Sequence, residues 1–224
     1  MCTVTFLPLT GDDFILTSNR DVGFQRAKAE RPKTYVENGV ELCYPKDGKA
    51  GGTWIGTSRN NRLICLLNGG FENHQRKEFY PKSRGLIVKE LLMAKNFESA
   101  SMHIDLKEIE PFTLVVVIWE KELRLIEFIW DGEQRYSKEL PPGPFIWSSS
   151  TLYDDQMKRM RIEWFDKWLS SHDISENEIL DFHKKGGIGN PETDVFMKRE
   201  KVGTVSITQV TKNHNGLKMR YEPF

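Results

Sequence analysis

Cys2 combines the two groups that acyl transfer needs, a thiol nucleophile and a base beside it. It follows the initiator methionine, and a small second residue predicts that an aminopeptidase removes Met1. The new first residue would then carry a thiol with a pKa of about 8.5 and an α-amino group with a pKa of roughly 7.7–8.0. The amine can therefore take the thiol proton during attack on a carbonyl. The alternative interpretation is a small apolar residue in a terminal strand.

The residues after Cys2 predict a β-hairpin that brings polar side chains beside it. Positions 3–7 alternate between polar and apolar residues, and an apolar run at 14–17 follows the turn residues Gly11-Asp12. If the turn is centred there, the residue numbers of two paired positions add up to about 23. This register places Cys2 opposite Arg20 or Asp21. The triplet Asn19-Arg20-Asp21 is therefore expected next to the nucleophile.

Charge and hydropathy exclude several classes of function. The 224 residues carry 32 basic and 32 acidic side chains, so the formal net charge is zero. No long-range field then attracts the chain to nucleic acid. The longest apolar run, Leu114–Trp119, is far shorter than the roughly 20 residues that span a bilayer, and no basic and apolar leader opens the sequence. We expect a cytoplasmic protein without a membrane span.

The cysteines and histidines do not form a metal-binding pattern. Three cysteines are an odd number without CxxC spacing, which indicates a reducing compartment and no disulfides. No two of the five histidines share a helical ligand spacing. We therefore expect no metal and no cofactor.

Apolar periodicity predicts an α+β order of elements in a single domain spanning 1–224. Besides the N-terminal hairpin, strands are expected near 33–36, 53–56, 62–67, 112–119, 122–130, 134–136, 145–147, 203–210 and 217–221. Helices are expected over 83–95, 97–104, 152–169 and 176–184. The first helix pair should cover a sheet face, and the strands of 112–136 should form a buried meander at the sheet centre.

An ordered series of short motifs resembles the NRDE family of transport and Golgi organisation 2-like proteins. The motifs are Met1-Cys2-Thr3-Val4-Thr5-Phe6, Asn19-Arg20-Asp21, Arg31-Pro32, Gly51-Gly52-Thr53-Trp54-Ile55-Gly56, Leu66-Leu67-Asn68, Ser83-Arg84-Gly85 and Gly203-Thr204. Val22 replaces the Glu that ends the family's signature tetrapeptide. The resemblance covers nearly the whole chain. It implies the N-terminal nucleophile hydrolase fold, a four-layer αββα sandwich like that of choloylglycine hydrolases and penicillin V acylases.

The resemblance also implies roles for individual residues. Cys2 would be the nucleophile, Asp21 would hold its α-amino group, and Arg20 would support the thiolate. Asn68, which follows the expected strand 62–67, would donate a hydrogen bond to the oxyanion. Its alternative role is to cap a turn with Gly69-Gly70.

Two positions depart from the pattern of these relatives. Ser150 stands where an Asn is usual before the long helix, and its hydroxyl can donate only one hydrogen bond. Val205 follows Gly203-Thr204 where the relatives keep an Arg. Asn19, Ser150 and Thr204 are therefore the weaker candidates for contact with substrate or oxyanion. Loss of one oxyanion donor lowers kcat by on the order of 10²–10³.

The resemblance implies hydrolysis of an amide bond in a small acylated substrate, with esters and thioesters as further substrates. The alternative is a non-catalytic carrier or chaperone that holds a lipophilic ligand, such as a lipid, acyl-CoA or haem, in the inherited cleft. Trp54, Phe71, Phe79 and Tyr80 are the aromatic residues that would line it. A third option is a scaffold with neither activity nor ligand. No option includes a nucleic-acid partner.

Overall fold

The computed structural model describes residues 3–224, which form two compact units. The terminal unit combines the chain up to Arg26 with Gly143–Phe224, and the central unit is Ala27–Pro142. Within the described residues each unit contains one antiparallel β-sheet and two α-helices. The predicted α+β class is therefore confirmed, whereas the single-domain organisation stays a prediction.

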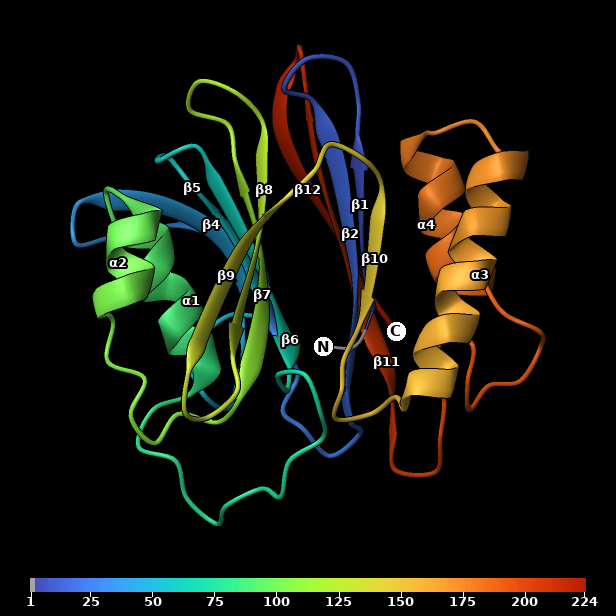
Figure 1. The fold of residues 1–224 in the computed structure, drawn as a ribbon, viewed down its shortest axis with the longest axis horizontal. Helices are drawn as coiled ribbons and strands as arrows, with labels where there is room; N and C mark the ends of the chain where they lie inside the picture. Colours follow the sequence, from blue (N-terminus) through green and yellow to red (C-terminus); the bar gives the residue numbers. More distant parts are fainter. Residues whose placement is uncertain (1–2) are drawn as a thin grey trace. The chain divides into compact units, whose positions relative to one another are not determined.

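The sheet of the terminal unit has β2 as its middle strand, in the order β10-β1-β2-β11-β12. Its strands are β1 (Thr3–Pro8), β2 (Phe14–Gly23), β10 (Phe145–Ser148), β11 (Val202–Asn213) and β12 (Gly216–Pro223). Helices α3 (Asp155–Ser171) and α4 (Glu176–Lys185) cover one face of this sheet (Figure 1). The N-terminal segment thus supplies β1 on one side of β2, and the C-terminal segment supplies β11 on the other side.

The predicted N-terminal hairpin is present, but its register differs by one residue from the predicted register. Thr3 pairs with Asn19 and Phe6 pairs with Leu16, so the numbers of paired residues sum to 22. Thr3 also pairs with Ser148 of β10, which holds it from the other side. Cys2 lies outside the described residues, so its pairing with Arg20 or Asp21 stays a prediction.

An apolar cluster fixes α3 and α4 to one end of this sheet. Leu7 and Ile15, from the β1–β2 hairpin, pack against Phe165, Trp168 and Phe182 of the two helices. The rings of Phe165 and Trp168 stack with their centroids 6.0 Å apart. Full burial of each such side chain contributes roughly 1.5–3 kcal/mol. The cluster therefore provides a rigid support for the polar end of the same sheet face.

The central unit is a seven-stranded sheet in sequential order, from β3 to β9. Its strands are β3 (Glu30–Glu37), β4 (Val40–Lys46), β5 (Ile55–Ser58), β6 (Arg62–Asn68), β7 (Phe112–Ile118), β8 (Arg124–Trp130) and β9 (Arg135–Leu140). Helices α1 (Arg84–Met93) and α2 (Phe97–His103) lie on one face of it, as predicted (Figure 1). Sequential order means that each strand pairs with its neighbour in the chain.

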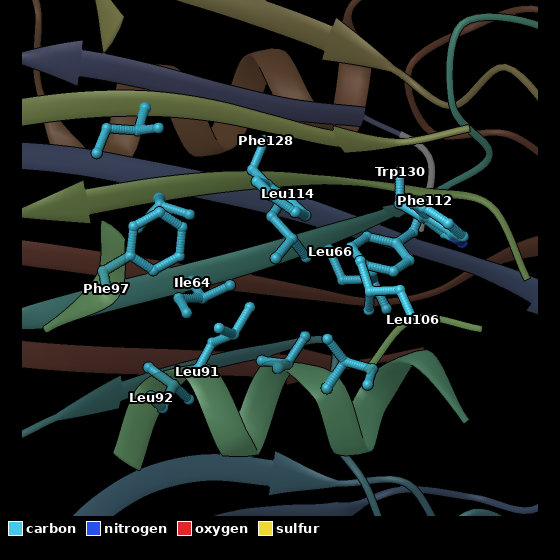
Figure 2. Packing of buried hydrophobic residues seen from close by; sticks show 14 of the residues in the cluster. Ile64, Leu66, Leu91, Leu92, Phe97, Leu106, Phe112, Leu114, Phe128 and Trp130 are labelled. Atoms are coloured by element: carbon cyan, nitrogen blue, oxygen red, sulfur yellow. The ribbon is translucent and has the colours of Figure 1, made fainter. Parts of the chain in front are cut away.

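The core of the central unit lies between its sheet and its helices. Figure 2 shows Leu91 and Leu92 of α1 below the side chains of Ile64 and Phe97, and all four are buried. At the end of α1 the buried Arg62 donates hydrogen bonds to the carbonyl oxygens of Leu91 at 2.7 Å and Ala94 at 2.8 Å. These carbonyls have no partner inside the helix, so Arg62 satisfies the helix terminus.

Two of the motif glycines are required by packing of the backbone. A Cβ atom on Gly52 would lie 2.5 Å from the carbonyl carbon of Gly85, and one on Gly85 would lie 2.8 Å from the oxygen of Thr53. The Thr53 N–H donates a hydrogen bond to the Gly85 oxygen at 3.2 Å. The motifs around Gly52 and Gly85 thus hold the start of α1 against the segment before β5.

Three elements differ from the expected ones. Strand β4 was not predicted, although Asn38 and Gly39 before it have φ values of +48° and +77°, which are typical of a type I′ hairpin turn. Strand β9 lies at the edge of the sheet and is mostly exposed, so the prediction of a wholly central meander is wrong. Helix α3 begins at Asp155 because the Asp154 side chain accepts the Met157 N–H at 2.8 Å and caps it.

Candidate active site

The face of the β1–β2 hairpin that meets α3 and α4 becomes polar toward its open end. Strand alternation places Thr3, Thr5, Asn19 and Asp21 on this face. Each of them contacts α3, α4 or a segment next to these helices. All four are buried, so each polar group needs a partner inside the protein. Thr3 and Asp21, at the open end, define the candidate site together with their partners, whereas Thr5 and Asn19 join the face to α4.

Asp21 is a buried carboxylate held by two hydroxyl groups. Only 1% of the surface of Asp21 is exposed to solvent. One oxygen, Oδ1, accepts a hydrogen bond from Thr204 Oγ1 at 2.6 Å, and Oδ2 accepts one from the Tyr153 hydroxyl at 2.9 Å. Hydrogen bonds to an ionised acceptor are roughly twice as strong as neutral ones. The orientation of the carboxylate is therefore fixed from two separate segments.

A β-bulge in β11 turns Thr204 toward Asp21. Thr204 pairs with Asp21 and Ser206 pairs with Arg20, so Val205 is the extra residue between the two pairs. The Thr204 hydroxyl donates to Asp21 and accepts the Met197 N–H at 3.0 Å. Bulges commonly re-aim a side chain in this way. The Gly203-Thr204 motif thus contributes a positioning hydroxyl for the carboxylate.

Arg161 of α3 also belongs to this site, and like Tyr153 it is not among the residues predicted from the sequence. It is fully buried, and its Nη1 donates to Thr3 Oγ1 at 2.5 Å. Its Nη2 donates to the carbonyl oxygens of Thr193 at 3.0 Å and Asp194 at 2.6 Å. The guanidinium carbon lies 3.6 Å from the centre of the Tyr153 ring, within cation–π distance. Arg161 thus joins the start of β1 to the residue that holds Asp21.

A signal for Arg161 exists in the sequence. Met157, Arg161, Phe165 and Trp168 follow a spacing of four, four and three residues, which places them on one stripe of a helix. A charged residue on an apolar stripe is rarely buried unless it has partners. Arg161 was therefore detectable as a buried cation, although its partners were not.

Asn19 connects β2 to the end of α4. Its Nδ2 donates to the carbonyl oxygens of His183 at 3.1 Å and Val195 at 2.8 Å, and its Oδ1 lies 2.6 Å from His183 Nδ1. The His183 carbonyl is in the last turn of α4, where carbonyls have no partner inside the helix. Both amide hydrogens of Asn19 are therefore engaged in the fold. A contact of Asn19 with substrate or oxyanion stays a prediction.

His183 is a buried neutral imidazole. Because Asn19 Oδ1 can only accept, Nδ1 carries the proton, and Nε2 accepts a hydrogen bond from Thr5 Oγ1 at 2.8 Å. Full burial, helped by the nearby charge of Arg161, lowers the pKa of His183 from 6.5 to about 3. Protonation would place a second cation beside Arg161, so this connection between the hairpin and α4 favours neutral histidine.

The low pKa of His183 predicts a loss of stability in mild acid. The unfolded chain takes up this proton near pH 6.5 and the folded chain only near pH 3, so the free energy of unfolding falls as pH drops through this window. The expected slope is about 1.4 kcal/mol per pH unit. Carboxylates with lowered pKa values, such as Glu37 and Glu98, start from 4.5. Urea unfolding between pH 6.5 and 5 therefore isolates His183.

A pair of variants checks this assignment. His183→Gln should flatten the dependence of unfolding free energy on pH, whereas His103→Gln, at an exposed histidine of α2, should leave the slope unchanged. An equal slope in wild type and His183→Gln would show that another group takes up the proton.

Arg20 and Ser150 are the other predicted site residues of the terminal unit. Arg20 is 3% exposed and points to the opposite sheet face from Asn19 and Asp21, by alternation along β2. Ser150 is buried in the turn before α3, where the Tyr153 N–H donates to the Ser149 oxygen at 3.2 Å. Consecutive residues of the Asn19-Arg20-Asp21 triplet thus serve different faces.

Two further predicted site residues are Asn68 and Cys2. Asn68 is the last residue of β6, in the central unit, where it pairs with Phe112 and is half-buried. Gly69 follows it with a φ of +85° and is held by a hydrogen bond from its N–H to the Pro111 oxygen at 3.0 Å. Cys2 lies outside the described residues. The roles of both stay predictions.

Comparison with known families decides the identity of this chain. Its sequence matches the family described as Transport and Golgi organisation 2 over residues 1–215. The chain belongs to this family. The resemblance found from the ordered motifs is thereby confirmed. Among curated protein sequences, none matches the chain.

Solved structures show which fold this member of the Transport and Golgi organisation 2 family adopts. The N-acylethanolamine-hydrolyzing acid amidase ortholog from Caenorhabditis elegans is similar with a TM-score of 0.60 at 13% sequence identity, over 93% of this chain and 92% of that one. A variant of conjugated bile acid hydrolase from Clostridium perfringens is similar with a TM-score of 0.55 at 8% identity, over 100% and 92%. The predicted N-terminal nucleophile hydrolase fold is confirmed.

Proposed function

We propose that this protein is a cysteine N-terminal nucleophile hydrolase that cleaves the amide bond of a small acylated substrate. Cys2 is the nucleophile after removal of Met1, Asp21 holds the α-amino group, and Arg20 supports the thiolate. Asn68, with backbone N–H groups, binds the oxyanion, and Ser150 contributes a weaker donor. Esters and thioesters are further substrates because their carbonyl carbons react with a thiolate in the same way.

The proposed reaction has two steps. The α-amino group takes the thiol proton, and the thiolate sulfur bonds to the carbonyl carbon to form a tetrahedral oxyanion. The C–N bond then breaks, and the leaving amine takes the proton from the α-ammonium group, which leaves a thioester on Cys2. Water attacks this thioester with the α-amino group as general base. The carboxylic acid leaves and the thiol is restored.

The observation that carries this proposal is the buried, doubly hydrogen-bonded Asp21 beside the start of β1. Thr3 pairs with Asn19, two residues before Asp21 in β2. Thr204 and Tyr153 fix the carboxylate, which can accept further donors through its remaining lone pairs. A buried ionisable side chain held in a fixed orientation is typical of functional sites. The fold shared with an acid amidase and a conjugated bile acid hydrolase supports the same interpretation.

Mass spectrometry of the purified protein tests the proposal. The intact mass should lack Met1, and iodoacetamide should modify one thiol, in the N-terminal peptide, faster than Cys43 and Cys65. A panel of acyl-amides and acyl-thioesters, screened against wild type with Cys2→Ala as the blank, should yield a thioester adduct on Cys2. Retained Met1 with an inert Cys2 thiol would disprove the proposal.

A carrier for a lipophilic ligand is the second candidate. Phe71 and Phe79, on the segment between β6 and α1, are 51% and 76% exposed, and exposed aromatic side chains favour contact with an apolar ligand. Trp54 is buried instead. Co-purified ligand whose binding survives Cys2→Ala, together with no turnover on the panel, would favour the carrier.

We propose that this enzyme is located in the cytoplasm. The odd number of cysteines, without CxxC spacing, supports that location. Within residues 3–224 no helix has both the length and the apolar character to cross a membrane.

A further inference from the structure

Arg161 is a buried cation whose partners among residues 3–224 are all neutral. Its described contacts are one hydroxyl, two backbone carbonyls and one aromatic ring. A charge buried without an opposite charge is costly unless hydrogen bonds satisfy it. A methionine or leucine at this position of α3 would extend the apolar stripe. The geometry around Arg161 therefore suggests a use beyond packing.

We propose that Arg161 is a positioning residue that fixes the start of β1, and with it Cys2, relative to Asp21. This inference rests on the proposed function. Nη1 of Arg161 holds the hydroxyl of Thr3, the residue that follows Cys2 in the chain. The same guanidinium lies over the ring of Tyr153, whose hydroxyl holds Asp21. One planar group thus sets both the strand that carries the nucleophile and the carboxylate assigned to its amine.

The opposite edge of the guanidinium is anchored equally well. Nη2 donates to the carbonyls of Thr193 and Asp194, and the next carbonyl, that of Val195, accepts from Asn19 Nδ2. The segment that anchors Arg161 is therefore itself fixed to β2, beside Asp21. The planar guanidinium can serve all these acceptors at once because its donors form a rigid fork. A lysine, with a single ammonium group, cannot.

Positioning matters here because one residue would supply both nucleophile and base. The thiol, the amine and the Asp21 carboxylate must stay within about 0.5 Å of their productive arrangement for efficient proton transfer. The first residue of a chain has a neighbour on one side only. Its position therefore depends on how firmly Thr3 is held.

Thr3→Val tests this inference because it removes only the link between Arg161 and β1. The carbonyl and ring contacts of Arg161 remain, and valine keeps the shape of threonine. The measurement is the rate of iodoacetamide alkylation of Cys2 against pH, followed by mass spectrometry. We expect the midpoint to rise toward the ordinary thiol value of about 8.5, and the rate at pH 7 to fall at least about fivefold. Thr3→Ser, which keeps the hydroxyl, should restore the wild-type profile.

Thr5→Val is the matched control. It removes a buried hydroxyl from the same strand and the same face, but one that contacts His183 instead of Arg161. Its alkylation profile should match that of wild type, although its melting temperature falls. Arg161→Lys, which keeps the charge but not the fork, is a second variant and should shift the profile as Thr3→Val does.

The outcomes separate this inference from the proposed function. If wild-type Cys2 is not a fast-alkylating thiol, the proposed function fails. If wild-type Cys2 reacts fast, and folded Thr3→Val and Arg161→Lys keep its profile, Arg161 has no positioning role and this inference is overturned. A shift in Thr5→Val equal to that in Thr3→Val would also overturn it, because general loosening of β1 would then be the cause.

Discussion

Asp21→Asn is expected to lower kcat for acyl hydrolysis by on the order of 10²–10³ while the protein remains folded. Asparagine has the shape of aspartate, so its Oδ1 can still accept from the Thr204 hydroxyl. The Tyr153 hydroxyl can rotate to accept from the new Nδ2. The negative charge that would hold the α-ammonium group is lost. Steady-state kinetics on the best panel substrate, with thermal melting in parallel, measure both effects.

Tyr153→Phe is the control for this prediction. It removes one hydrogen bond to Asp21 but leaves the carboxylate charge and the aromatic ring beneath Arg161. We expect a rate on the order of tenfold below wild type, because a hydrogen bond to a carboxylate contributes roughly 1.5–3 kcal/mol and Thr204 still holds the other oxygen. Hydrolysis by Asp21→Asn at the wild-type rate would exclude Asp21 from the mechanism.

Asn19→Ala is expected to lower the free energy of unfolding by about 3–5 kcal/mol, the largest such loss among the variants described. The change leaves the His183 Nδ1–H and the carbonyls of His183 and Val195 without their partner. All three groups are buried in the terminal unit, between β2 and α4. Urea unfolding at pH 7 measures the difference in free energy.

Ser18→Ala provides the comparison at the neighbouring position. Ser18 is equally buried, but the only described hydrogen bond of its side chain is a long one of 3.5 Å to the Asn19 oxygen. We expect a loss below about 1 kcal/mol. Equal losses in the two variants would show that the contacts of the Asn19 side chain contribute little.

The parts of the fold that depend on local signals were predictable. The alternation of β1 and β2 and the turn between them lie within about twenty consecutive residues, and the pattern predicted the hairpin to within one residue of register. Because it lies toward the end of the same hairpin, Asp21 was predicted to lie near the start of the chain. Strand β4 was also within reach, because Asn38-Gly39 is a strong turn signal.

The partners of the site residues could not be predicted because they come from distant parts of the chain. Asn19 lies 164 residues before His183, and Asp21 lies 183 residues before Thr204. The register of β2 with β11 depends on a bulge at Val205 that no local pattern indicates. Sequence patterns therefore give no sign that the Asn19 amide holds the end of α4, and its contact with substrate or oxyanion stays a prediction.

The terminal unit consists of two separate segments of the chain, so it cannot fold until the second segment has been synthesised. Strand β2 needs β11 beside it, and the Asp21 carboxylate needs Thr204, which leaves the ribosome on the order of 10–40 s later at usual rates of translation. The β1–β2 hairpin alone is marginally stable at best. The N-terminal residues are therefore still accessible to processing enzymes while Ala27–Pro142 is being made. Processing of Met1 would thus precede the burial of Asp21, so the proposed nucleophile is freed before its surroundings are complete.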